Sequence, residues 1–176
     1  AEAGGGGAWT QISSQTASGD TEIDFTTLSA DYRDFMVVGS NIKSYINADM
    51  WVRVDAGSGF ASADYKYTMV GNDSGGSASN VSSNSAAQVT LNYHGWDSAA
   101  AYNGAFQVIV FDVHSTTINK IMHCEYDYWD NVHELTCGVG SGSYDGATTA
   151  ITGLRIMPAS GNFPSGEFTL YGRKIT

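Results

Sequence analysis

The sequence predicts an all-β domain in which two antiparallel sheets pack into a jelly-roll-like β-sandwich. Three observations favour this fold class. Short apolar stretches recur about every 10–15 residues, apolar and polar residues alternate within them, and no window of 11–18 residues carries a helical stripe. The composition agrees, because Thr suits pleated surfaces while Gly, Asn and Ser suit turns. Gly accounts for 21 of the 176 residues and Pro for only 2.

The chain divides into a short arm and one folded unit. The Gly-rich segment 1–8 offers little apolar surface and is expected to be a flexible arm. Residues 9–176 have the length of a single domain and form the predicted sandwich. Its predicted strands, in chain order, are Trp9–Ser13, Thr21–Thr26, Asp34–Gly39, Ala48–Asp55, Asp64–Val70, Gln88–Tyr93, Ala105–Val113, Lys120–Trp129, Val132–Gly138, Ala150–Met157 and Glu167–Lys174.

The spacing of apolar residues supports these strands. In the stretch 50–55 every second residue is apolar (Met50, Val52 and Val54), which places one face of the strand on a core. The stretch 106–113 is apolar at most positions, as expected of a central strand that is covered on both faces.

A long polar segment, Gly71–Ala87, interrupts this pattern. It consists mainly of Gly, Ser, Asn and Ala, so it has little to bury and is predicted to be an exposed loop. Loops of this length are either functional or mobile without a role, and both alternatives stay open. On the functional alternative, three of its side chains are candidates for contact with a partner: Asn72, Ser74 and Asn80.

The overall charge is strongly acidic, with a net charge of −10 and a pI of about 4.5. Such a surface repels phosphate groups, so nucleic acids and anionic membranes are not expected as partners. The chain also lacks a run of 18 apolar residues, so no membrane span is predicted.

The two cysteines lie in the best-defined predicted hairpin. A two-residue turn at 130–131 would pair Trp129 with Val132, and counting outward from that pair sets Cys124 opposite Cys137. A cross-strand disulfide is then geometrically conceivable. The alternative is two reduced, buried cysteines, as in a protein assembled in a cytosol.

Residues that could carry chemistry form no recognisable motif. The same hairpin register sets Asp127 opposite Glu134, but the spacing of known calcium-binding loops is absent. The four histidines have no metal-ligand spacing, and there is no nucleophile elbow, phosphate-binding loop or zinc-protease motif. Two carboxylates at a suitable separation would be enough for a glycoside hydrolase, but 18 acidic residues supply many accidental pairs. The sequence therefore predicts no enzyme, no cofactor and no metal centre.

Several aromatic side chains are candidates for partner contacts. Trp51 lies beside Arg53 in a predicted polar face, and Tyr65 and Tyr67 flank Lys66. Exposed aromatic rings stack on sugars or fill subunit interfaces, whereas most aromatic rings belong to cores. All three interpretations stay open for this set: Trp9, Trp51, Tyr65 and Tyr67.

The C-terminal stretch 151–174 reads I-T-G-L-R-I-M-P-A-S-G-N-F-P-S-G-E-F-T-L-Y-G-R-K. It resembles the ending I-T-G-[IL]-R-x-x-x-[AS]-S-G-N-[FI]-x-S-G-x-F-x-L-Y-G-x-K of virion structural proteins from tailed bacteriophages. The stretches 9–18, 23–26 and 40–42 fit the same family, whereas 58–103 matches only in its strand rhythm. Within the C-terminal stretch, Gly161 and Gly166 suit turns, and Phe168 and Leu170 share the strand face that is expected to point to the core.

This resemblance implies a β-sandwich on the outside of a virus particle that is assembled in the host cytoplasm. It carries no catalytic residues. It favours a capsid decoration (cement) protein that binds the major capsid protein or other virion proteins as a homo-oligomer, with a trimer as the expected state. The alternative is a receptor- or glycan-binding module of a tail fibre or of a secreted protein.

Overall fold

The computed structural model describes residues 8–92, 94–99 and 101–174, and these residues are folded into strands and connecting loops without a helix. Segment 1–7 of the predicted arm lies outside the described residues. The strands are β1 (Trp9–Ala17), β2 (Ile23–Phe25), β3 (Asp34–Lys43), β4 (Met50–Asp55), β5 (Tyr65–Asp73), β6 (Ala78–Ala86), β7 (Val89–Thr90), β8 (Gly104–Val110), β9 (Lys120–Trp129), β10 (Leu135–Tyr144), β11 (Gly153–Pro158) and β12 (Ser165–Arg173).

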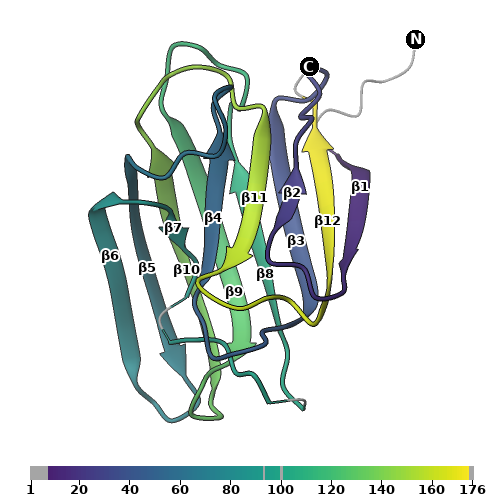
Figure 1. The fold of residues 1–176 in the computed structure, drawn as a ribbon. Coiled ribbons are helices and arrows are strands. Elements are labelled where there is room, and N and C mark those ends of the chain that lie inside the picture. Colours follow the sequence, from purple (N-terminus) through teal and green to yellow (C-terminus); the bar gives the residue numbers. More distant parts are fainter. Residues whose placement is uncertain (1–7, 93, 100, 175–176) are drawn as a thin grey trace.

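The strands form two antiparallel sheets of unequal size (Figure 1). The larger sheet has eight strands in the order β1-β12-β3-β8-β9-β10-β5-β6, and the smaller has four in the order β2-β11-β4-β7. The predicted two-sheet antiparallel sandwich is confirmed. The finer jelly-roll description stays a prediction.

The core lies between the two sheets. Strands β3 and β8 of the larger sheet and β4 and β11 of the smaller sheet contribute apolar side chains at alternate positions, as the period of two predicts. These side chains belong to one buried cluster that includes Phe35, Val37, Val52, Val54, Val108, Leu154 and Ile156.

The two C-terminal strands follow the prediction. Gly161, within the loop between them, and Gly166, at the start of β12, have φ angles of 76° and 155°, which glycine adopts without strain. Phe168 and Leu170 then alternate into the core from β12.

The predicted loop at Gly71–Ala87 is wrong. Most of this segment is a β-hairpin, because β5 continues to Asp73 and β6 begins at Ala78. Pairing with β5 satisfies the backbone of β6 on one side, and an edge strand needs few apolar side chains when it is largely exposed. Small polar residues therefore form a strand here in spite of their weak strand propensity.

The predicted register between β9 and β10 is also wrong. Leu135, rather than Val132, pairs with Trp129, because the chain makes a longer turn over 130–134. Cys124 consequently faces Gly140, and Cys137 faces Asp127. Cys124 is buried on the inner side of the sheet whereas Cys137 is exposed on the outer side, so the two thiols are free and cannot bridge each other.

Candidate functional site: the open face of the larger sheet

The outer surface of the eight-stranded sheet, on the side away from the smaller sheet, is here called the open face. Alternate residues of each strand point onto it, and cross-strand neighbours form rows across the sheet. One row runs from β6 to β8 through Asn80, Val70, Val139, Glu125 and Gln107. The rows mix apolar, amide and carboxylate side chains.

Apolar side chains are unusually exposed on this face. Val70 of β5, Ile121 of β9, and Leu135 and Val139 of β10 expose 49%, 58%, 47% and 40% of their surface. Val70 and Val139 are cross-strand neighbours, and Ile121 and Leu135 lie four residues from that row along β9 and β10. Several exposed apolar side chains on one sheet face mark a candidate site of association. Because three adjacent strands supply these side chains, the open face is the first candidate for a partner.

A hollow of about 560 Å³ lies among strands β6, β5, β10 and β9 of the open face. Two of the predicted contact residues, Asn72 and Asn80, line it together with Cys137 and the carboxylates of Glu125 and Asp127. Two smaller hollows of about 280 and 220 Å³ share Asp127 with it and extend toward β8 and β3. The depression can therefore receive a protruding group that donates hydrogen bonds to carboxylates and amides.

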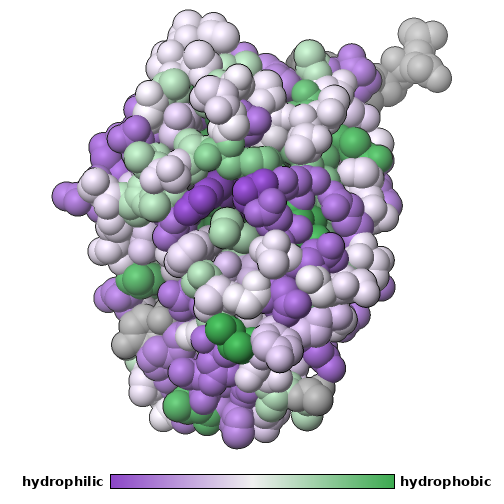
Figure 2. Space-filling view, in the orientation of Figure 1, coloured by the Kyte–Doolittle hydropathy of each residue, from purple (hydrophilic) through white to green (hydrophobic). Residues whose placement is uncertain are grey.

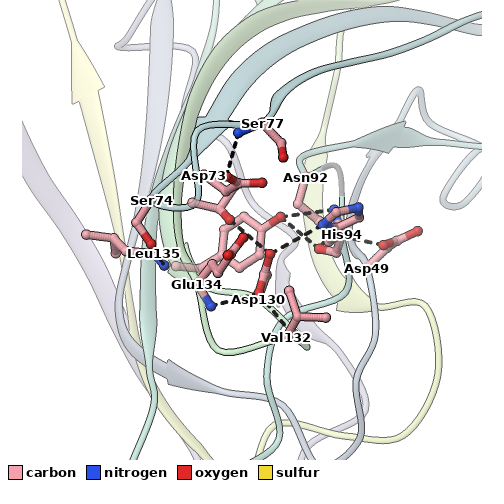
Figure 3. Close-up of polar contacts among 12 residues, drawn as sticks. Asp49, Asp73, Ser74, Ser77, Asn92, His94, Asp130, Val132, Glu134 and Leu135 are labelled. Atoms are coloured by element: carbon pink, nitrogen blue, oxygen red, sulfur yellow. Dashed lines mark hydrogen bonds and ion pairs between the residues drawn. The ribbon is translucent and has the colours of Figure 1, made fainter.

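A buried carboxylate fixes the turn at one end of this face (Figure 3). Asp130 is fully buried and accepts backbone N–H groups from Val132 at 2.9 Å and from Glu134 at 3.0 Å. The Thr136 hydroxyl and His94 Nδ1 lie 3.3 Å from its second oxygen. Burial alone would raise the pKa of Asp130, but these donors hold that pKa below its ordinary value.

The same turn is tied to the neighbouring hairpin. The Leu135 N–H donates to Ser74 Oγ at 3.2 Å, and the Ser74 N–H donates to the Leu135 carbonyl at 2.8 Å. Asp73 accepts the Ser77 N–H at 2.8 Å and thereby closes the turn between β5 and β6. The predicted contact residue Ser74 thus joins the two turns that border the open face and present Val132 and Leu135 to solvent.

A second polar cluster, formed by Asp49, Asn92 and His94, lies beside Asp130 and connects the segment around His94 to β4 (Figure 3). Asn92 donates to Asp49 at 3.0 Å and accepts the Met50 N–H at 2.6 Å. Burial raises the pKa of Asp49, and the Asn92 amide and His94 oppose that rise. These contacts satisfy buried backbone groups and hold the loop, which is a structural role.

The predicted aromatic contacts do not gather at the open face. Lys66 takes the open face of β5, so Tyr65 and Tyr67 turn to the opposite side. The expectation of an exposed Tyr65 is wrong, because this side chain is buried and its hydroxyl accepts the Val54 N–H at 2.8 Å. Tyr67 is half-buried.

The two predicted tryptophans lie away from the exposed apolar side chains of the open face. Trp51 is half-buried on the outer face of the smaller sheet. Trp9 lies half-buried at the start of β1, with the Arg173 guanidinium 5.1 Å from its ring centre.

The outer face of the smaller sheet has a different character. A hydrophilic band crosses it in Figure 2. On this face Arg155 forms two hydrogen bonds with Asp24, at 2.7 and 2.6 Å, and a third contact with Glu22 at 2.8 Å. The positive charge of Arg155 is therefore already balanced within the molecule, and the open face remains the better candidate site.

Sequence reasoning missed the four exposed apolar residues of the open face. A signal for Val139 was present, because the stretch 137–143 (C-G-V-G-S-G-S) alternates glycine with larger residues. Ile121 also alternates with Met122 and Lys120, but its outward direction depends on which side the smaller sheet covers.

Comparison with known proteins finds no family model, no curated protein and no solved structure that matches this chain. In the described part of the chain, no three His, Cys, Asp or Glu side chains are grouped so that they could hold a metal ion. The described residues also contain no helix long and apolar enough to cross a membrane.

Proposed function

We propose that this protein is a non-enzymatic virion structural protein that decorates the exterior of a tailed-phage capsid. The observation that carries the proposal is the exposure of Val70, Ile121, Leu135 and Val139 on one sheet face. The resemblance of residues 151–174 to virion structural proteins supports the proposal that the protein belongs to a phage particle. The open face docks on the capsid shell, and the major capsid protein is the proposed partner.

The chemistry of the open face defines what the partner must present. Apolar side chains at its centre gain free energy when a partner excludes water from them. The carboxylates of Glu125 and Asp127 line the hollow beside them, so a matching surface carries Lys or Arg around an apolar centre. An acidic decoration protein and a basic patch on a shell would also attract each other before contact.

The test is binding to undecorated phage heads. Val139→Asp and Val70→Asp, each made singly, should weaken co-sedimentation with heads by tenfold or more, as expected for central interface residues (about 1.4 kcal/mol or more). Ile118→Asp is the matched control, because Ile118 is 47% exposed in the loop between β8 and β9. If both valine variants bind as well as the control, the open face is not the docking surface.

A second function is favoured by the lining of the hollow. Asn72, Asn80 and Asp127 offer amide and carboxylate groups of the kind that bind sugar hydroxyls, so the alternative is a glycan- or receptor-binding module. Calorimetric titration with oligosaccharides tests it. If the binding heat disappears in Asn72→Ala and Asn80→Ala but remains in Asn84→Ala, whose residue lies outside this hollow, the glycan-binding function is favoured over capsid decoration.

A further inference from the structure

The two sheets have four edge strands, and three of them are protected against pairing with another chain. In the smaller sheet, β2 has only three residues and β7 only two. In the larger sheet, β1 carries an irregularity in its register between Gln11 and Ser13. Short strands and bulges are the usual devices that keep a sheet edge from pairing. Strand β6 has neither device over most of its length.

Strand β6 presents a long and regular edge. Six consecutive residues, 78–83, pair with β5 in unbroken register, and the irregularity of this pair lies beyond Ser83. In the described part of the chain no strand pairs with the other side of β6. Figure 1 shows β6 at the margin of the molecule, beyond the strands of the smaller sheet. Its outer N–H and C=O groups are therefore available to an added strand.

The side chains of β6 suit a second copy of the same chain. The strand reads A-S-N-V-S-S-N-S-A and contains no charged residue and no proline, the two residue classes that most often block sheet edges. Two copies with a net charge of −10 each repel one another over most of their surface. An uncharged strand is where two such copies can meet without placing like charges opposite each other.

We propose that β6 pairs with β6 of a second copy, antiparallel and about a two-fold axis, so that one continuous sheet runs through both copies. An axis perpendicular to the sheet keeps both open faces on the same side. Asn80 and Ser82, both exposed on the open face, then lie beside the same residues of the second copy. Val81, which points to the other side, contacts the second copy's strand there. The contact borders the proposed docking face and shares Asn80 with the hollow, but it does not rest on the proposed function.

The pairing predicts a dimer, in place of the trimer expected from the family resemblance. Light scattering of the purified full chain should give twice the monomer mass of 18.7 kDa. Asn80→Lys with Ser82→Lys should give the monomer mass, because four ammonium groups would gather at the joint. The matched control is Ser14→Lys with Thr16→Lys, two exposed positions on the other long edge strand, which should leave the dimer intact.

A charge-swap experiment identifies the partner strand. Asn80→Glu with Ser82→Glu should also be monomeric, and mixing it with the lysine variant should restore a dimer that contains one copy of each. Circular dichroism and thermal unfolding of every variant check that it folds. A wild-type chain that is monomeric or trimeric overturns the proposal, as does a lysine variant that folds and stays dimeric. Loss of the dimer in the β1 control, or no recovery on mixing, overturns it equally.

Discussion

The Tyr126 hydroxyl occupies the space on the inner side of β10 that a β-carbon on Gly138 would need. The two residues are cross-strand neighbours in one row, which continues through Gly71 to Ser79. A β-carbon on Gly71 would also lie only 2.7 Å from the same hydroxyl. Two adjacent strands therefore carry glycine in this row because the ring of Tyr126 lies flat across them.

Gly138→Ala should destabilise the fold by about 1–3 kcal/mol, because the new methyl group overlaps the Tyr126 ring and the backbone of β5. Denaturant unfolding measures the change. Tyr126→Phe is the informative companion, because the buried hydroxyl has no hydrogen-bond partner within the described residues and burial raises its pKa to about 12. Removal of the Tyr126 hydroxyl should therefore leave the stability of the fold unchanged or raise it slightly. A Tyr126→Phe variant as unstable as Gly138→Ala would mean that the hydroxyl has a partner after all.

Asp130→Asn should destabilise the protein by about 1–3 kcal/mol at neutral pH, because an amide cannot accept all the donors that surround this buried carboxylate. The folded-state pKa of Asp130 is lowered, so its contribution to stability is complete above the ordinary carboxyl pKa of 3.8. The contribution is lost as the pH falls through the lower, folded-state pKa.

Urea unfolding between pH 7 and pH 2 tests this pH dependence. The difference in stability between wild type and Asp130→Asn should be constant from pH 7 to about pH 5 and should shrink below pH 4. Asp31→Asn, at an exposed position, is the control and should follow the wild type throughout. A difference that persists undiminished at pH 2 would show that the carboxylate charge is not what stabilises the turn.

Much of the fold could be predicted because period-two alternation reports directly which residues face the core. The alternation placed Phe168 and Leu170 on the core face correctly. It would also have predicted that Tyr65 is buried, because Tyr65 shares a strand face with Met69. The position of Tyr65 next to Lys66 wrongly suggested that the Tyr65 ring is exposed. Neighbours in sequence point to opposite faces of a strand, so the exposure of Lys66 argues for burial of Tyr65.

Two features could not be predicted from local sequence. Strand β6 forms because its backbone hydrogen-bonds to β5. The sequence A-S-N-V-S-S-N-S-A by itself does not indicate this pairing. The register of β9 and β10 depends on Asp130, whose carboxylate binds two N–H groups of its own turn and lengthens it. His133 in that turn has a φ of 67°, a conformation that sequence alone gave no reason to expect. The candidate site depends on both features.

The two thiols should differ sharply in reactivity. Cys137 is exposed in the hollow of the open face, whereas burial raises the pKa of Cys124 to about 12. A thiol reagent should therefore modify one cysteine per chain in the native protein and both in denaturant, with peptide mapping locating the first at Cys137. Cys137→Ser should abolish the native reaction. If neither thiol reacts until a reductant is added, the two are bonded and the register of β9 and β10 is different.

Lys120→Met should destabilise the fold by about 1–3 kcal/mol, although it removes a buried charge. Lys120 is fully buried, and its ammonium donates to the carbonyls of Ile118 at 3.0 Å and Thr148 at 3.2 Å. Burial lowers the pKa of Lys120, and the nearby Asp112 carboxylate opposes that effect. Methionine fills the space but leaves the carbonyls without a donor, so this loss outweighs the relief of the charge.

Hydrogen exchange localises the effect of that substitution. Backbone amides in the loop 112–119 and near Thr148 should exchange faster in Lys120→Met, since the ammonium is the link between these two segments. Lys66→Met is the control, because Lys66 is about half exposed and its ion pair with Asp145 is worth less than about 1 kcal/mol. If Lys120→Met is as stable as this control and the loop amides keep their protection, then the buried ammonium does not hold the loop.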